Sequence, residues 1–169
     1  MKLGIIGAGN MGSSILKGVT ASNFLENRNI AIFDLNEKKI EELSKEYRIK
    51  KAENENELAK ESDILILSVK PNVVPKVLDK IKDDLSEKTI VLSIAAGISI
   101  DFIENIIGTD KKVIRTMPNT PAQVMEGMTA VSFNHNIQEN EKSMIFKLLN
   151  SFGKSIEIEE KLMHAYTGI

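Results

Sequence analysis

Lys2-Leu3-Gly4-Ile5-Ile6-Gly7-Ala8-Gly9-Asn10-Met11-Gly12, residues 2–12, is the stretch that decides the fold of this chain. A run of aliphatic residues leads here directly into a complete G-x-G-x-x-G pattern. Continuous aliphatics are typical of a buried parallel strand. In a phosphate-binding turn, Gly7 makes the tight turn, Gly9 lets the backbone approach a pyrophosphate, and Gly12 lets the next helix pack closely on the strand.

The residues that follow the glycines predict a helix and a second strand. Apolar residues recur at helical spacing at Met11, Ile15, Leu16 and Val19. The first amides of this helix would face the phosphates. The next apolar run, 29–34, ends at Asp34, where a carboxylate can accept hydrogen bonds from an adenosine ribose. The alternative is an ordinary strand-to-helix turn, but the order of strand, glycines, helix and acid favours dinucleotide binding.

Length and composition exclude several classes of protein. A chain of 169 residues can bury one good core and part of a second domain. Its 42% hydrophobic and 27% charged residues are typical of a globular domain, and its apolar runs are too short to span a bilayer. A net charge of -2, with lysines and glutamates interspersed, gives no attraction to nucleic acid or anionic lipid. We therefore expect neither a nucleic-acid nor a membrane partner. Because the N-terminus shows no secretory signal, we also expect a cytoplasmic protein.

Few residues are available for metal or thiol chemistry. The chain has no cysteine, which excludes disulfides, thiol catalysis and cysteine-ligated metal. Its two histidines, His135 and His164, have no metal-ligand spacing with each other or with nearby carboxylates. Surface or structural roles are favoured for both over a ligand or a catalytic base. We therefore expect no metal site.

Strand-like and helix-like runs alternate along the chain, which is typical of βαβ units. The patterns predict strands over 3–6, 29–34, 49–52, 63–69, 89–94, 112–115, 128–133 and 155–158. The run 63–69 is the most hydrophobic and predicts a buried central strand. Two capping boxes, Asn54-x-x-Glu57 and Asn136-x-x-Glu139, predict helix starts. We expect an α/β fold with a doubly wound, mostly parallel sheet and helices on both faces.

Three further strand ends are candidates for a binding site, because ligands of open parallel sheets bind at the carboxyl ends of strands. They are Ser68–Pro71, Ile94–Gly97 and Arg115–Pro121. Small residues there leave room for a flat nicotinamide ring. For Ala95–Gly97 ordinary loop chemistry is an equal alternative, and for Lys70 simple exposure to solvent is slightly favoured over catalysis. Arg115 could pair with a carboxylate or phosphate, and a structural ion pair is favoured for it.

Taken together, these motifs resemble those of the pyrroline-5-carboxylate reductase family. The resemblance covers the whole chain and is carried by the glycine loop with Asn10-Met11, Val69-Lys70-Pro71, Ser93-Ile94-Ala95-Ala96-Gly97, Arg115-Thr116-Met117-Pro118-Asn119-Thr120-Pro121 and the closing residues 160–168. The M-P-N-T-P run is the most specific of them. The resemblance implies a Rossmann-type fold and NAD(P)H-dependent reduction of 1-pyrroline-5-carboxylate to L-proline, a step of proline biosynthesis.

Specific site residues are implied as well. The expected cofactor contacts are Ile6, Gly7, Ala8, Gly9, Asn10, Met11, Gly12, Asp34, Asn36, Ser68, Val69, Lys70, Pro71, Ala95, Ala96 and Gly97. Asn119 and Thr120 are expected on the substrate side, and no catalytic residue is assigned. The choice between NADP and NAD stays open, because Asp34 would repel a 2′-phosphate whereas Lys38 and Lys39 would attract it.

A domain boundary is expected near the end of the chain. Residues 1–158 would form the NAD(P)-binding domain, and residues 159–169 would begin a helical domain that is truncated here. In the family that domain forms the dimer and holds the substrate carboxylate. We thus expect a homo-oligomer for the intact protein, and for this chain alone a monomer or weak association without reductase activity. The alternatives are a non-catalytic nucleotide-binding module and a related hydroxyacid dehydrogenase.

Overall fold

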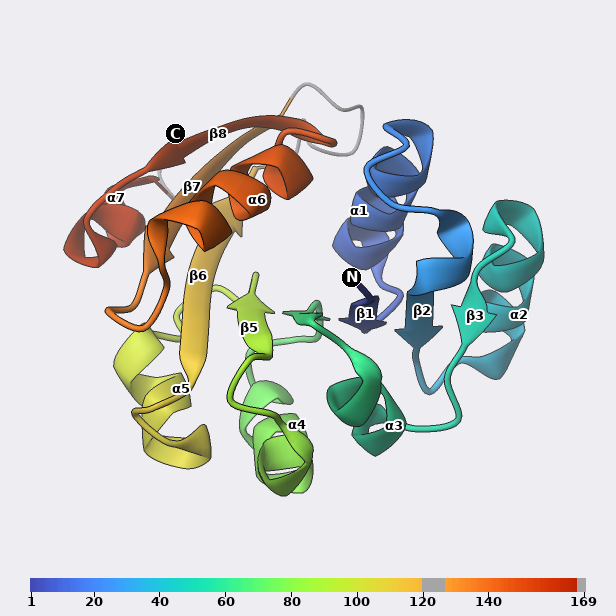
Figure 1. The fold of residues 1–169 in the computed structure, drawn as a ribbon, viewed down its shortest axis with the longest axis horizontal. Coiled ribbons are helices and arrows are strands. Elements are labelled where there is room, and N and C mark those ends of the chain that lie inside the picture. The colour runs from blue at the N-terminus through green and yellow to red at the C-terminus, as the bar shows by residue number, and fades with distance from the viewer. Residues whose placement is uncertain (120–126, 167–169) are drawn as a thin grey trace.

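The computed structural model describes residues 1–119 and 127–166. Within them the strands form an eight-stranded sheet in the order β3-β2-β1-β4-β5-β6-β7-β8 (Figure 1). Neighbouring strands are parallel except for the antiparallel pair β6 and β7. The expected doubly wound, mostly parallel α/β sheet is confirmed. The strands are β1 Leu3–Ile6, β2 Ile30–Phe33, β3 Lys50–Lys51, β4 Ile64–Leu67, β5 Ile90–Ser93, β6 Lys112–Pro118, β7 Gly127–Phe133 and β8 Gly153–Glu157.

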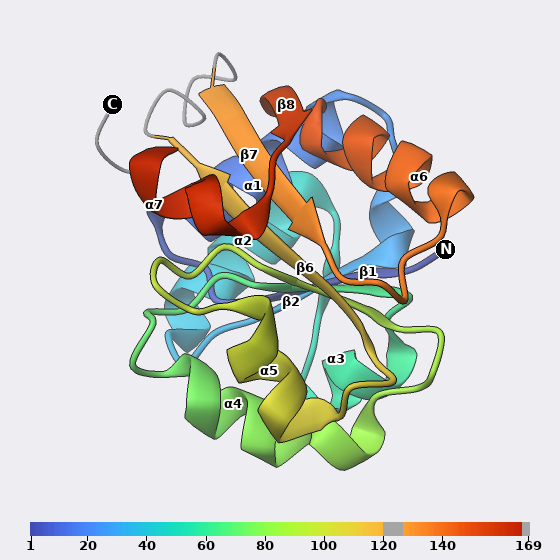
Figure 2. The ribbon, with the colours of Figure 1, turned by 90° about the vertical axis from the view of Figure 1, so that its left-hand side faces the viewer.

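Helices cover both faces of this sheet (Figure 1). They are α1 Asn10–Ala21, α2 Glu37–Tyr47, α3 Glu55–Glu61, α4 Val74–Ile81, α5 Ile100–Ile107, α6 Glu139–Leu149 and α7 Met163–Tyr166. Buried residues of α1, α2 and α6 form one hydrophobic core with the sheet, and those of α3, α4 and α5 form the other. Figure 2 shows α4 and α5 on the side of the sheet opposite to α6. Burial of one such aliphatic side chain contributes about 1.5–3 kcal/mol, so both faces stabilise the fold.

Of the two expected capping boxes, one is formed in part and the other is wrong. In the first, the Glu57 side chain accepts from the Glu53 amide and not from the Asn54 amide. Asn54 caps α3 as expected, because its Oδ1 accepts a hydrogen bond of 2.9 Å from the Glu57 amide. Asn136 does not begin a helix; its side-chain amide donates to the carbonyls of Thr109 and Lys111, each at 2.8 Å. The capping box of α6 lies two residues later and is formed by Gln138 and Glu141.

Asn134 holds together the loops at the end of β7. It is 8% exposed, and its Oδ1 accepts a hydrogen bond from the Val113 amide at 3.2 Å. Its Nδ2 donates to Glu104 Oε1 at 2.7 Å and to the Lys111 carbonyl at 2.8 Å. The side chain thereby joins β6, β7 and α5.

We expect Asn134→Ala to lower the free energy of unfolding by about 2 kcal/mol, because it leaves buried donors and acceptors unpaired. Urea denaturation measures this change. The matched control is His135→Ala at the exposed neighbouring residue, which should change stability by less than about 0.5 kcal/mol. Equal stability of the two variants would show that the Asn134 hydrogen bonds contribute nothing.

Candidate functional site

The strand order of the sheet reverses direction at β1. β2 and β3 lie on one side of β1, whereas β4, β5 and β6 lie on the other. At such a switch point the loops that leave neighbouring strands run to opposite faces and open a crevice at the carboxyl ends. The crevice here is a groove of about 330 Å³. It is lined by Ile6, Gly7, Gly9, Phe33, Asp34, Leu35, Glu55, Ser68, Val69, Lys70, Val73 and Val77.

The three glycines of the turn have different surroundings. Gly7 has φ +103°, a conformation that favours glycine, and its amide donates to the Phe33 carbonyl at 2.8 Å. A Cβ at Gly12 would collide with the Gly7 carbonyl oxygen, so Gly12 permits the close packing of α1. Gly9 differs from both, because its φ is an ordinary −63° and a Cβ there would meet no atom within 4 Å. The fold therefore explains Gly7 and Gly12, and it leaves open space at Gly9 where a ligand backbone could approach.

The N-terminus of α1 has neither a capping side chain nor an acidic residue, which suits it to bind an anion. Gly9 is its N-cap residue, no side chain caps it, and its first turn holds no acidic residue. In contrast, side chains cap α2, α3 and α5 at Asn36, Asn54 and Ser99. The free amides of the first turn and the positive end of the helix dipole thus remain available to a phosphate at the groove.

Asp34 lies at the end of β2 beside the glycine turn. Its Oδ2 accepts a hydrogen bond of 2.6 Å from the Ala8 amide, and its Oδ1 accepts one of 2.8 Å from the Asn36 amide. Both carboxylate oxygens are thereby held in place. Each oxygen keeps a second lone pair that can accept a hydrogen bond from a hydroxyl group in the groove.

The groove brings together seven of the residues that the sequence predicts for the cofactor site, namely Ile6, Gly7, Gly9, Asp34, Ser68, Val69 and Lys70. Ala8, Asn10, Met11 and Gly12 continue the same turn into α1. The Asn36 side chain is used as the cap of α2, where its Oδ1 accepts from the Lys39 amide at 3.1 Å. Five lining residues were not predicted: Phe33, Leu35, Glu55, Val73 and Val77.

The other predicted residues lie outside the lining of this groove. Ala95, Ala96 and Gly97 follow β5, the strand next to β4, and Gly97 has φ +75° with open space around it. Pro71 follows Lys70 at the end of β4. Asn119 follows β6, and its Oδ1 accepts a hydrogen bond from the Met128 amide at 2.9 Å, which ties it to β7. Thr120 lies outside the described residues.

Arg115 is buried and forms an ion pair with a partly exposed carboxylate, Glu160. Its side chain is 2% exposed, and its Nη1 lies 3.0 Å from Glu160 Oε1. The same oxygen accepts a hydrogen bond of 2.8 Å from the Ile100 amide at the start of α5. Arg115 Nε and Nη2 have no partner among the described residues. The favoured interpretation of Arg115, a structural ion pair, agrees with this geometry.

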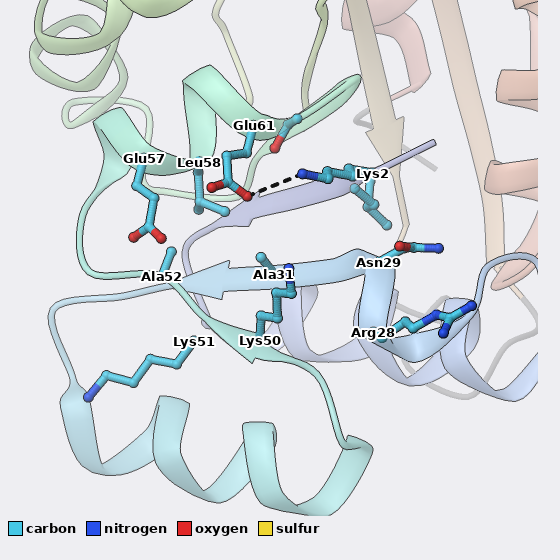
Figure 3. A pocket seen from close by; sticks show the side chains of 12 residues that line it. Lys2, Arg28, Asn29, Ala31, Lys50, Lys51, Ala52, Glu57, Leu58 and Glu61 are labelled. Atoms are coloured by element: carbon cyan, nitrogen blue, oxygen red, sulfur yellow. Dashed lines mark hydrogen bonds and ion pairs between the residues drawn. The ribbon is translucent and has the colours of Figure 1, made fainter.

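A second hollow, of about 100 Å³, lies away from the groove, at the other end of the strands (Figure 3). It is near the amino ends of β1, β2 and β3, where Lys2 and Glu61 form an ion pair of 3.5 Å. None of the predicted site residues lines it.

Residues 1–119 and 127–166 hold neither a candidate metal cluster nor a candidate membrane-spanning helix. In this part of the chain, no three His, Cys, Asp or Glu side chains are grouped so that they could hold a metal ion. No helix there has the length and apolar character needed to cross a membrane.

Comparison with known proteins identifies relatives of this chain. The model of a family described as NADP oxidoreductase coenzyme F420-dependent matches residues 2–97. The pyrroline-5-carboxylate reductase of Escherichia coli (strain K12) is 36% identical over 99% of this chain and 62% of its own length. That of Aquifex aeolicus (strain VF5) is 40% identical over 100% of this chain and 62% of its own length. The resemblance predicted from the motifs is confirmed, and the chain spans about three fifths of these relatives.

A solved structure of Plasmodium falciparum pyrroline carboxylate reductase with NADP bound is also similar. It superposes with a TM-score of 0.90 and 31% identity, over 100% of this chain and 62% of that chain.

Proposed function

This chain belongs to the family of coenzyme F420-dependent NADP oxidoreductases, and we propose that it binds NAD(P)H along the groove. The pyrophosphate would lie at the turn of Gly7–Gly12, and the adenosine ribose at Asp34. The open space at Gly9 is the observation that carries this proposal, because no contact among the described residues requires a glycine there. The uncapped start of α1 supports it independently.

We propose further that residues 1–158 are the cofactor domain of an enzyme that reduces 1-pyrroline-5-carboxylate to L-proline. The two sequence relatives with that name support this substrate. The cofactor, when bound, supplies the hydride. The chain's own part is to orient the nicotinamide. Residues 68–71 follow β4 and residues 95–97 follow the adjacent strand β5, where small residues and backbone groups can face a flat ring. Asn119 and Thr120 are proposed on the substrate side.

Two measurements test the proposal. Titration of this chain with NADH and NADPH, followed by cofactor fluorescence, tests the binding half. A chimaera that joins residues 1–169 to the remaining C-terminal part of the Escherichia coli relative tests the substrate half, through NAD(P)H oxidation and proline formation that depend on 1-pyrroline-5-carboxylate. We expect both to succeed.

Other outcomes favour the alternatives. Cofactor binding without turnover in a folded chimaera would favour a nucleotide-binding module without catalysis. Oxidation of a 3-hydroxy acid, with no reduction of the imine, would favour a hydroxyacid dehydrogenase. Absence of binding for both cofactors would refute the assignment of the groove.

A further inference from the structure

We propose that this groove selects NADH over NADPH through two carboxylates, Asp34 and Glu55. Asp34 is a fixed negative charge at the ribose position, and Glu55 is a second carboxylate in the lining of the groove. The inference rests on the proposed function, because it requires the adenosine ribose to lie at Asp34. It concerns the one cofactor property that the sequence leaves open.

Asp34 cannot turn away from a ligand without losing two hydrogen bonds. The Ala8 amide holds Oδ2 at 2.6 Å, and the Asn36 amide holds Oδ1 at 2.8 Å. A free 2′-hydroxyl group can donate a hydrogen bond to this carboxylate. A phosphate monoester carries about −1.5 to −2 charges at neutral pH and has only acceptor oxygens, so it would be repelled at the same place.

Glu55 adds a second carboxylate to the lining of the groove. It is the first residue of α3, its side chain is 12% exposed, and its Oε2 lies 2.5 Å from Lys80 Nζ on α4. The Lys80 side chain is 49% exposed, so its ammonium group is accessible to solvent although it is paired. A neutral residue at position 55 would remove this carboxylate from the lining of the groove.

The remaining lysines do not offset these charges. Lys38 and Lys39 are absent from the residues that line the groove in the described part of the chain. Lys70 does line it, but it follows β4, which is separated from the end of β2 by β1. The glycine turn after β1 therefore lies between Lys70 and Asp34.

The test compares dissociation constants for NADH and NADPH in the unaltered chain, Asp34→Asn and Glu55→Gln. We expect the unaltered chain to bind NADH at least about tenfold more tightly. Asp34→Asn should reduce this preference about tenfold, and Glu55→Gln about threefold. Higher ionic strength should also weaken the preference, since salt screens the repulsion.

Glu61→Gln is the matched control. It makes the same chemical change in the same helix. Glu61, however, pairs with Lys2 at the hollow near the amino ends of the strands, away from the groove (Figure 3). Its cofactor preference should equal that of the unaltered chain. Circular dichroism confirms that each variant is folded.

The outcomes separate this inference from the function on which it rests. If neither cofactor binds the unaltered chain, the proposed function is refuted. If both bind and the chain prefers NADPH, or if Glu55→Gln shifts the preference no more than Glu61→Gln, the inference alone is overturned.

Discussion

Gly9→Val is expected to abolish cofactor binding and to leave the fold intact. We expect the dissociation constant for the preferred dinucleotide to rise at least about 100-fold, or about 2.7 kcal/mol, since the side chain fills the place of the pyrophosphate. The fold tolerates the change because a Cβ at Gly9 meets no atom within 4 Å and φ is −63°. Weaker helix capping should cost at most about 1 kcal/mol of stability. Fluorescence titration and thermal unfolding measure the two effects.

Gly12→Val is the contrasting control. Its Cβ would collide with the Gly7 carbonyl oxygen and lie 2.9 Å from Ser68 Oγ, so α1 would have to move. We expect this variant to lose both stability and binding. The assignment of the turn fails if Gly9→Val binds the dinucleotide as well as the unaltered chain does. It also fails if the two variants are destabilised to the same degree.

Local patterns were sufficient to predict the centre of the fold. The aliphatic runs of β1 and β4 are buried at every position, so their hydrophobicity alone predicts central strands. The glycine spacing predicts three different roles, and the surroundings of Gly7 and Gly12 agree with the two structural ones. The role of Gly9 at a pyrophosphate stays a prediction. These features depend on residues that are close in sequence, or on the burial of a whole strand.

The remaining lining of the groove depends on contacts between distant elements. Leu35 is 87% exposed and gives no periodic signal, and Val73 and Val77 also fit a helix face that packs on the core. Glu55 resembles any acidic residue in the first turn of a helix until α4 brings Lys80 to it from 25 positions away. The error at Asn136 has a similar cause, because its side chain bonds to carbonyls that precede it by 25 and 27 positions.

Removal of the carboxylate that pairs with Arg115 should be the most destabilising change that we predict. In Glu160→Ala the Arg115 side chain, 2% exposed, loses its counter-ion, and two of its nitrogens have no partner within residues 1–119 and 127–166. The Ile100 amide loses its acceptor as well. Breaking a buried ion pair on one side costs about 3–5 kcal/mol, and we expect a loss of at least about 3 kcal/mol in urea denaturation.

Glu159→Ala is the matched control, because the adjacent Glu159 pairs with Lys161 where both side chains are exposed, at 68% and 74%. Such surface pairs contribute between about 0 and 1 kcal/mol. A double variant shows whether the loss of stability in Glu160→Ala comes from the unpaired charge of Arg115 or from lost packing. If the buried charge causes the loss, Arg115→Met combined with Glu160→Ala should be more stable than Glu160→Ala alone, since the double variant has no charge left to bury. A double variant that is less stable would mean that Arg115 acts mainly through its packing, and that Glu160 anchors the segment before α7 by its bond to α5.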